Sequence, residues 1–492
     1  MSRLVLGPFN RVEGDLEVQL EVADGRVTQA QVNAPMVRGF ENMLQGRDAM
    51  DALTIVPRIC GICSVSQSVA AAKALGDALG LSPAPNGQHA INLMLGCENL
   101  ADHLTHFYIF FTPDFTRAAY AGRDWYASVK GRFAAVTDAS GGGGQSRKAL
   151  AARARWMELM GVLGGKWPHT GSVLPGGSSR AIDAAERLRL LVRVREMRQF
   201  LEHNLYGSPL EDVLALDSAA ALQSWRARAA GSDLACFLDL VDDCKLKSMG
   251  PGPGHYLSYG TYTQPDGAPL LAAGVWDDAS ASVRALDAAQ ISEDSCHAWL
   301  ADADQGSALH PRAGQTLPQP DKPGAYTWNK APRLGGKVVE TGAIARQLVC
   351  GQPLIRSEVA LHGGTVYTRV LARLVELAQV LVHMEGWLGA LRPQEPFYQT
   401  HPPLQQGEGV GLSEAARGAL GHWLRVEHGR IAHYQIVAPT SWNFSPRDAA
   451  GQPGALEAAL VDAPLDAGEP GQSVAVQHIV RSFDPCMVCT VH

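Results

Sequence analysis

Two pairs of cysteines with the same spacing stand near opposite ends of the 492-residue sequence. The first pair is Cys60 and Cys63, and the second is Cys486 and Cys489, just before the last residue, His492. Cysteines three positions apart can direct both sulfurs at one ion, and four thiolates favour zinc, an iron–sulfur cluster or a soft transition metal. We therefore predict that the fold brings the two pairs together around one thiolate-bound metal centre.

The cysteine spacing alone leaves two kinds of metal centre open. Paired CxxC motifs are most often structural zinc sites, but such sites usually separate their pairs by about 15–20 residues. The far larger separation in this chain implies a site buried between distant parts of the fold. A structural zinc ion and a reactive metal both remain compatible with the cysteines.

A few other side chains are candidates only in context. Glu13 and Glu41 are single acids beside turn glycines, for which a solvated surface position is the ordinary interpretation, and most lone histidines such as His492 bind no metal. Arg417 lies in the apolar stretch 414–423. Because a buried arginine must have acceptors, it marks a site more often than an exposed one does.

Strands and helices are both expected around the first cysteine pair. Residues 1–35 alternate apolar and polar side chains on either side of a turn at 23–25, which predicts an N-terminal β-hairpin region. An apolar stripe over 63–79 predicts a helix that places the cysteine pair at its N-terminus, where free amides and the helix dipole favour thiolates. A longer helix is predicted over 88–111, and it carries Asp102.

The remainder of the chain is also read as mainly helical. Helices are predicted at 147–162, 179–204 and 357–391, and a hairpin with a His-Gly turn is predicted over 423–437. Residues 205–340 are weakly periodic and give no assignment. We expect an α+β fold that forms a single unit over 1–492, with a large central helical bundle and small flanking β-sheets. Its helical core comprises 60–205 and 357–391, and 420–492 supply a C-terminal β-hairpin and the metal-binding end.

Composition restricts the class of protein. The 42 basic and 49 acidic residues give a net charge of -7, which leaves no electrostatic footprint for nucleic acid. Only 18% of residues are charged, against about a quarter on average. This deficit indicates either a surface covered by a partner subunit or a large core. There is no run of about 18 apolar residues, so we expect no segment that spans a membrane. The first residues show no apolar export segment and no twin arginine, so we expect a cytoplasmic protein with reduced thiols.

Short segments in a fixed order carry a family resemblance. They are Arg11–Gly14, Arg38–Glu41, Arg58–Cys63, Asp102–Tyr108, Lys330–Arg333, Ala416–Trp423, Pro439–Asn443 and Ser482–His492. Over nearly its whole length the chain resembles the large subunit of [NiFe] hydrogenases. The resemblance implies that family's fold, H2 as the substrate, and a Ni–Fe(CO)(CN)2 centre.

The resemblance assigns a role to each cysteine of the two pairs. Cys60 and Cys486 would be terminal thiolates on nickel, whereas Cys63 and Cys489 would bridge nickel to iron. Arg417 would lie over the open coordination position.

Other residues would support that centre. Asp102 and Asp484 would hold Arg417 in place, and Thr440 would hydrogen-bond a cyanide. Glu41, His492 and the backbone carbonyl of Ile436 would ligate Mg²⁺ or a similar hard cation.

The implied reaction is heterolytic cleavage of H2. A proton would pass to the Cys486 sulfur or to Arg417, and Glu13 would relay it outward. Electrons would leave through iron–sulfur clusters in a separate small subunit, since the only paired cysteines of this chain are already used. Such a partner also explains the low charge content.

Departures from the family pattern refine the expected role. Asp15 and Gln67 stand where catalytic members usually carry histidine, and Ala416 replaces a usual proline. Ile62 and Phe110 occupy normally smaller positions that line the gas channel, where bulk would narrow the route for oxygen.

These departures, with a sequence that stops at His492 where catalytic members are made with a further peptide, resemble the hydrogen-sensing (regulatory) subgroup. Its members are cytoplasmic, slow and comparatively oxygen-insensitive, and they signal to a histidine kinase. The alternative is an energy-conserving uptake hydrogenase. A complex I-like scaffold without metal is a more distant alternative, which the four cysteines disfavour.

Overall fold

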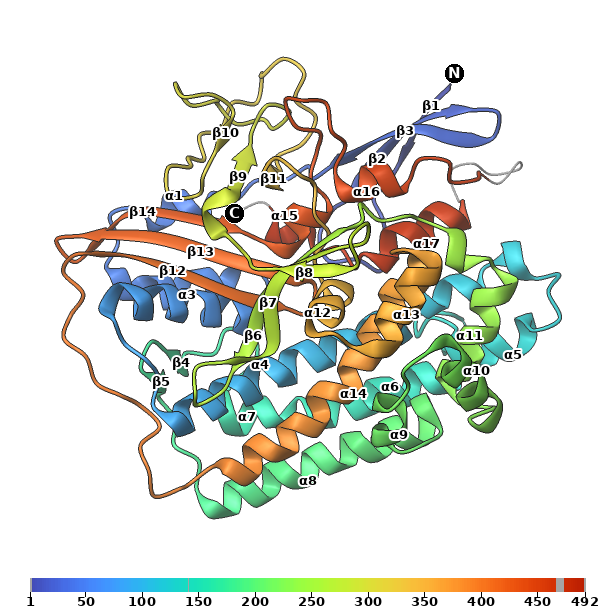
Figure 1. Cartoon of the computed structure of the whole chain (residues 1–492), viewed down its shortest axis with the longest axis horizontal. Coiled ribbons are helices and arrows are strands. Elements are labelled where there is room, and N and C mark those ends of the chain that lie inside the picture. The colour runs from blue at the N-terminus through green and yellow to red at the C-terminus, as the bar shows by residue number, and fades with distance from the viewer. Residues whose placement is uncertain (1, 140, 466–472, 491–492) are drawn as a thin grey trace.

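The N-terminal region forms a three-stranded antiparallel sheet. The computed structural model describes residues 2–139, 141–465 and 473–490. Strands β1 (Ser2–Leu6), β2 (Glu17–Ala23) and β3 (Arg26–Asn33) pair in the order β1-β2-β3 (Figure 1). The predicted hairpin is present, and its turn holds Asp24 and Gly25 at positive φ, as a tight hairpin requires. The added strand β1 leaves a loop, residues 7–16, that reaches the second cysteine pair.

A second three-stranded sheet lies directly against the helix that follows the first cysteine pair. Strands β12 (Gly407–Ala415), β13 (Gly418–Glu427) and β14 (Arg430–Val437) pack on α3 (Ser64–Leu79). A Cβ at Gly409 or Gly411 would come within 1.9 Å of a helix carbonyl oxygen, so only glycine allows this approach. The β13–β14 hairpin and the α3 helix were both predicted, whereas β12 was not.

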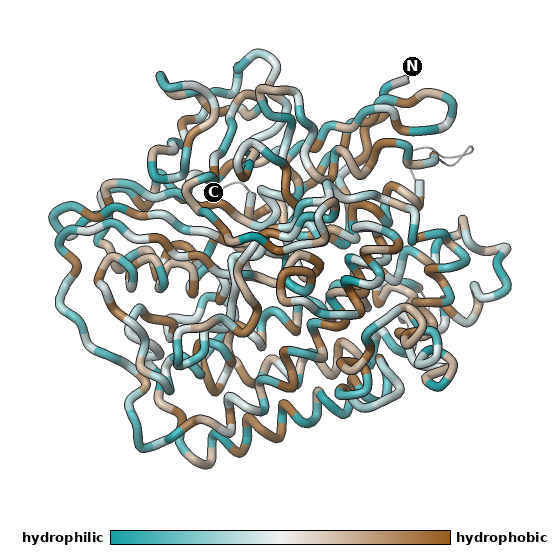
Figure 2. The backbone as a smooth tube through the Cα atoms, in the orientation of Figure 1, coloured by the Kyte–Doolittle hydropathy of each residue, from teal (hydrophilic) through white to brown (hydrophobic). Residues whose placement is uncertain are grey.

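The helical centre is built around two long helices. Helix α4 (Pro85–Thr105) continues as a π-helical segment, η3 (His106–Phe111), which together match the predicted helix over 88–111. It packs against α14 (Val366–Ala390), whose hydrophobic residues run along its whole length (Figure 2). The helix expected over 357–391 is divided in two, because α13 (Pro353–His362) ends at Gly363 and a Cβ at Gly364 would lie 2.1 Å from the Tyr256 hydroxyl.

Further helices surround this centre. The expected helix over 147–162 is broken into α6 (Gly144–Trp156) and α7 (Glu158–Gly164), and the one over 179–204 is α8 (Ala184–Phe200) followed by the π-helical η6 (Leu201–Tyr206). The other helices are α1 (Phe40–Leu44), α2 (Ala52–Ile55), α5 (Tyr126–Phe133), α9 (Leu210–Leu214), α10 (Ala219–Arg228), α11 (Asp233–Asp243), α12 (Ala343–Cys350), α15 (Pro439–Asn443), α16 (Ala455–Ala459) and α17 (Val474–Ser482). Among the described residues, no helix combines the length and apolar character that a membrane crossing needs.

Residues 205–340, which had no assignment from sequence, contain two further sheets. A third sheet joins β6 (His255–Thr263), β7 (Pro269–Asp277) and β8 (Ser282–Arg284), and a fourth has the order β10-β9-β11. The short strands are β4 (Val173–Leu174), β5 (Gly177–Ser178), β9 (Ile291–Asp294), β10 (Ala308–Leu309) and β11 (Ala331–Leu334). The predicted α+β fold, with a helical centre and small sheets beside it, is confirmed (Figure 1).

Candidate metal centre

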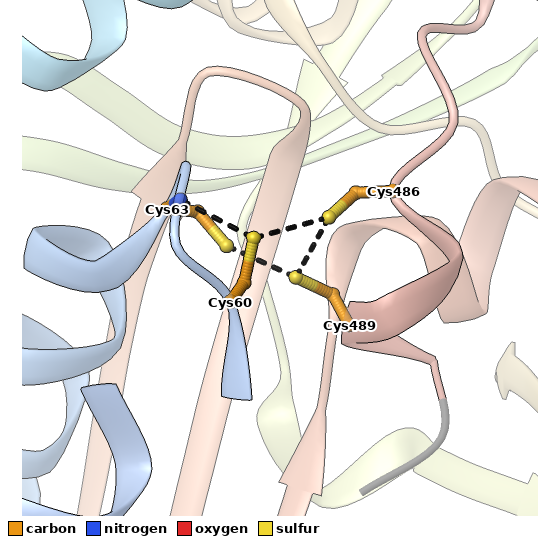
Figure 3. Close-up of side chains that lie close together, drawn as sticks. All are labelled: Cys60, Cys63, Cys486 and Cys489. Carbon is orange, nitrogen blue, oxygen red and sulfur yellow. Dashed lines mark hydrogen bonds between the residues drawn. The ribbon is translucent and has the colours of Figure 1, made fainter. Parts of the chain in front are cut away.

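The fold brings the two cysteine pairs together, as their spacing predicted. The Sγ atoms of Cys63 and Cys489 lie 3.0 Å apart, and that of Cys486 is 3.4 Å from Cys60 and 3.0 Å from Cys489. All four sulfurs lie within 4.8 Å of one another and are buried (Figure 3). These separations exceed the S–S bond length of about 2.05 Å, so the thiols are free and converge as metal ligands do.

The first pair is positioned by the start of α3. Cys63 is the N-cap residue of this helix, and Cys60 follows the 3-10 turn η2 (Val56–Ile59) in an extended conformation. The backbone N–H groups of Ile62 and Cys63 point at the Cys60 sulfur, at 3.2 and 3.5 Å. Such donors at a helix N-terminus stabilise a thiolate.

The second pair is held by the loop between β1 and β2. The Met487 N–H donates to the Glu13 carbonyl at 2.7 Å, and the Glu13 N–H donates to the Pro485 carbonyl at 3.4 Å. Gly14 has positive φ, and a Cβ there would lie 2.9 Å from the Val488 nitrogen. The Cys486 N–H donates to the Thr440 hydroxyl at 3.1 Å. The short 3-10 turn η10 (Met487–Cys489) then carries Cys489 back to the cluster.

The cluster cannot ionise fully without a cation. The pKa of the Cys60 thiol lies well below its usual range, because Cys486, Cys489 and Cys63 can donate hydrogen bonds to its thiolate. Burial raises the pKa of Cys486 and of Cys489. One thiolate is therefore favoured and further ones are opposed, which is the electrostatic arrangement that a bound metal cation relieves.

Arg417 lies beside the sulfurs, between β12 and β13. Its Nη1 is 2.8 Å from an Asp102 carboxylate oxygen, and its Nη2 is 3.1 Å from one of Asp484. Its Nε donates to the Asp484 carbonyl at 3.0 Å. Burial would lower the pKa of Arg417, but the two carboxylates outweigh burial and raise it, so the guanidinium stays charged. The expected contact of both aspartates with Arg417 is present.

Several polar atoms of this group lack an aligned hydrogen-bond partner among the described residues. They are Arg417 Nη1, both Asp102 carboxylate oxygens and Asp484 Oδ2. The ion-pair distance to Asp102 is short, but the N–H direction does not match it. Buried polar atoms without a protein partner can bond to water, an ion or another bound group. Four convergent thiols beside a charged guanidinium fit a soft metal with a polar ligand next to it.

Glu13 and Arg38 link the two cysteine segments. Burial and the Cys60 thiolate raise the pKa of the half-buried Glu13, although Arg417 and Arg38 oppose this. The Arg38 guanidinium donates to the carbonyl of Ile59, at 2.5 Å, and to that of Val488. In the sequence Arg38 stands out only as part of the Arg38–Glu41 segment, and its contacts with both cysteine segments were not predicted. The sequence feature that could have pointed to Arg38 is its position three residues before Glu41.

The residues expected around a hard cation are partly brought together. Glu41 is buried, and its Oε1 accepts a hydrogen bond from the Ile436 N–H at 2.8 Å, while Lys330 Nζ lies 4.0 Å from Oε2. A cavity of about 20 Å³ beside Glu41 is lined by Thr316, Lys330 and others, and it has room for one water or ion. His492 lies outside the described residues.

The remaining predicted positions lie close to the cluster or on the helices beside it. Ile62 stands between the two cysteines of the first pair, half-buried, and Phe110 is half-buried in η3, with its carbonyl accepting a hydrogen bond from Arg11 at 2.8 Å. Gln67 accepts from His422 at 2.8 Å, whereas its own amide nitrogen has no partner among the described residues. The gas-channel role of Ile62 and Phe110 stays a prediction.

Comparisons with known proteins agree on the kind of centre. The sequence profile of the nickel-dependent hydrogenases matches residues 38–124 and 147–492. The chain is 31% identical to the periplasmic [NiFeSe] hydrogenase large subunit of Desulfomicrobium baculatum, covering 100% of this chain and 95% of that relative. It is 27% identical to the uptake hydrogenase large subunit of Cupriavidus necator, with the same coverage. The solved Dm. baculatum [NiFeSe]-hydrogenase superposes with a TM-score of 0.84 at 30% identity, covering 100% of both chains.

Proposed function

The chain belongs to the nickel-dependent hydrogenase family, whose members are oxidoreductases acting on H2, and we propose that it cleaves H2 heterolytically at a Ni–Fe centre held by its four clustered cysteines. The observation that carries this proposal is the convergence of the four buried sulfurs beside the charged guanidinium of Arg417. A structural zinc site has no use for such a guanidinium, because zinc with four thiolates is already saturated.

Each cysteine has a proposed role at this centre. Cys60 and Cys486 would hold nickel, and Cys63 and Cys489 would hold both nickel and the iron that carries carbon monoxide and cyanide. The centre supplies the Lewis acidity that makes H2 acidic. Thr440, which already accepts from the Cys486 N–H, is suited to orient a cyanide with its hydroxyl proton.

The protein residues then handle the proton. Arg417 is held charged by Asp102 and Asp484, so it stabilises negative charge and does not act as a base. The Cys486 thiolate is the better acceptor. Glu13 pairs through its backbone with Cys486, and its raised pKa allows it to carry a proton in neutral solution more readily than an exposed glutamate.

Electron transfer needs a partner. Among the described residues, the four-cysteine cluster is the one group of three or more cysteine, histidine and acidic side chains that lie close enough together to hold a metal ion. We propose a small subunit with iron–sulfur clusters as the electron acceptor. The cavity at Glu41 supports a further Mg²⁺ or similar hard cation, with the Ile436 carbonyl and His492 as additional ligands.

Two physiological roles fit this chemistry. The named relatives include uptake hydrogenases, which favours an energy-conserving uptake role over the sensing role expected from the sequence. Hydrogen sensing through a histidine kinase is the second candidate, and the observation favouring it is Gln67, which stands one turn after Cys63 and is hydrogen-bonded to His422. Rapid H2 oxidation without kinase binding supports uptake, whereas slow turnover with kinase association supports sensing.

The proposal is tested on the purified complex. Infrared spectroscopy should show intrinsic carbonyl and cyanide stretches, and metal analysis should find one nickel per chain. Zinc without nickel would reject the proposal. In the same complex, Glu13→Gln should slow H/D exchange by about 100-fold, in line with loss of a proton-transfer residue, while the infrared bands persist. Unchanged exchange would remove Glu13 from the proton path.

A further inference from the structure

A buried carboxylate sits at the start of α3, next to the first cysteine pair. Glu98 comes from α4, and its side chain is buried. Its Oε2 accepts hydrogen bonds from the Val65 N–H at 2.8 Å, the Trp167 ring N–H at 3.0 Å and the Ser64 hydroxyl at 3.2 Å. Its Oε1 accepts from the N–H and the hydroxyl of Ser66, at 2.9 and 3.0 Å. One carboxylate thus receives five hydrogen bonds.

This carboxylate replaces the cap that the helix does not provide for itself. Cys63 is the N-cap residue of α3, and its side chain makes no capping hydrogen bond. The free N–H groups of Val65 and Ser66 at the first turn are taken by Glu98 instead. A negative charge at this position also meets the positive end of the helix dipole. The Cys63 sulfur is therefore left free to point into the cluster.

Glu98 also fixes the loop that covers the first pair. Through Trp167 it anchors residues 164–170, and the neighbouring His169 donates its N–H to the Ser64 hydroxyl at 3.3 Å and its ring to the Pro57 carbonyl at 2.9 Å. The Pro168 ring lies 4.0 Å from the Cβ position of Gly61. The turn between the two cysteines is thus enclosed between α3 and this loop, with Glu98 joined to both.

Glu98 lacks a cationic partner in the described part of the chain, although most buried acidic side chains in proteins form an ion pair. Among the described residues, no cationic nitrogen lies within ion-pair distance of it, and its five donors are neutral. A buried carboxylate without a counter-ion is unfavourable to folding. The position of Glu98 beside the turn that carries the first cysteine pair fits a role in holding that turn.

We propose that Glu98 is a positioning residue for the metal centre, which fixes the Cys60–Cys63 turn by capping α3 and anchoring the loop at Trp167. This inference rests on the proposed metal-binding function. It assigns to Glu98 no contact with substrate or metal. Its action passes through the first turn of α3, so the geometry and affinity of the four thiolates should respond to changes at Glu98.

The test compares Glu98→Gln with Glu457→Gln. Glutamine keeps the shape of Glu98 but offers one acceptor oxygen and turns an NH2 donor toward N–H and O–H donors. Glu457 is a matched control, because it is buried in α16 and also accepts from neutral donors, Val32 N–H at 3.0 Å and the Tyr326 hydroxyl at 2.8 Å. Both variants should lower the melting temperature.

Two readouts separate positioning from general stability. In the purified complex, Glu98→Gln should shift or broaden the infrared carbonyl and cyanide bands, whereas Glu457→Gln should leave them in place. In the metal-free full chain, Co²⁺ added alone should bind about 10-fold more weakly to Glu98→Gln, the lower end of the effect expected when a ligand's support is lost, and its thiolate charge-transfer absorption should change. If both variants give the wild-type spectra, or both give the same change, Glu98 has no positioning role.

A milder variant keeps the test decisive if Glu98→Gln does not fold. Trp167→Phe removes one of the five donors and retains an aromatic ring, so it should cause a smaller shift in the same direction. Wild-type spectra and Co²⁺ affinity for Trp167→Phe alongside an unfolded Glu98→Gln would overturn the proposal. Failure of the proposed function is seen separately, as an absence of carbonyl and cyanide bands in the wild type, and the Co²⁺ comparison then decides the role of Glu98 alone.

Discussion

Arg346 and Arg417 are both buried and each lies between two carboxylates, yet their surroundings differ. Arg346, on α12, donates from Nε and Nη2 to Glu376 at 2.8 and 2.7 Å, and from Nη1 to Glu414 at 2.7 Å. Nη1 and Nη2 also donate to the backbone carbonyls of Ala415 and Ala416, at 2.9 and 3.0 Å. Arg417 approaches its two aspartates as closely, but its Nη1 and both Asp102 oxygens have no aligned partner among the described residues.

The difference separates a stabilising ion network from one that serves a site. In the Arg346 network each charged group has its full set of hydrogen bonds, as a buried structural ion pair requires. In the Arg417 network, which lies beside the four sulfurs, Nη1 and both Asp102 oxygens have no aligned hydrogen-bond partner among the described residues. Satisfied hydrogen bonding therefore indicates structure, and incomplete hydrogen bonding next to soft ligands indicates function.

The carboxyl groups of the two networks nevertheless titrate in parallel. Burial raises the pKa of Asp102 and of Glu414 to about 7. In the other member of each pair, Asp484 or Glu376, burial is outweighed by the arginine, which lowers the pKa. Each network thus holds one carboxyl with a raised pKa and one with a lowered pKa, but Asp484 also lies 3.5 Å from a second arginine, Arg373.

The largest expected effect comes from breaking the structural network. Arg346→Met should destabilise the protein by about 3–5 kcal/mol, because Glu376 and Glu414 lose a buried partner. Chemical denaturation of the variant and the wild type measures the change. A loss below about 1 kcal/mol, the value of an exposed pair, would show that Arg346 is not the structural member of the comparison.

Arg417→Lys should lower the rate of H2 cleavage strongly and the stability of the protein only slightly. The lysine keeps the charge that Asp102 and Asp484 need but cannot reproduce the planar guanidinium. We expect H2 cleavage to fall by about 10²–10³-fold, as for loss of one preorganised donor, with nickel content unchanged and the melting temperature within a few degrees of wild type. Wild-type H2 cleavage with a large loss of stability would place Arg417 in the same class as Arg346.

A smaller effect should appear in the pH dependence of stability. Burial raises the pKa of Glu414 from its usual value of 4.5 to about 7, so its contribution to folding stability is fully present below pH 4.5 and is lost as pH rises to about 7. Glu414→Gln should flatten this part of the stability curve by on the order of 1 kcal/mol. Parallel curves for variant and wild type between pH 4.5 and 7 would contradict the assignment.

The Arg417 network could be predicted from the sequence, whereas the Arg346 network could not. The contact of Arg417 with Asp102 and Asp484 was expected, since all three lie in segments shared with the hydrogenases. Arg346 was not singled out, because two of its partners lie on a strand, β12, that was not predicted. Gly407, Gly409 and Gly411 resemble a turn in sequence, whereas the fold uses two of these glycines for contact with α3.

Local patterns also failed where tertiary contact decided the outcome. The helix expected over 357–391 is interrupted because Gly364 lies against Tyr256, a residue in a region that had no assignment. Glu98 was missed although it precedes Asp102 by one helical turn, which places two acids on one face of an apolar helix. Its five donors come from two distant segments, and sequence spacing does not show that they meet.

The backbone pairing of Glu13 with the Cys486 segment joins parts of the chain that are synthesised far apart in time. Residues 485–487 leave the ribosome hundreds of codons after residues 11–14, so the early segment must wait for its partner. Until that late arrival the thiols of Cys60 and Cys63 stand without their counterparts. The four-thiol site is therefore incomplete until the Cys486 segment docks, and only after that step can all four sulfurs hold one metal ion.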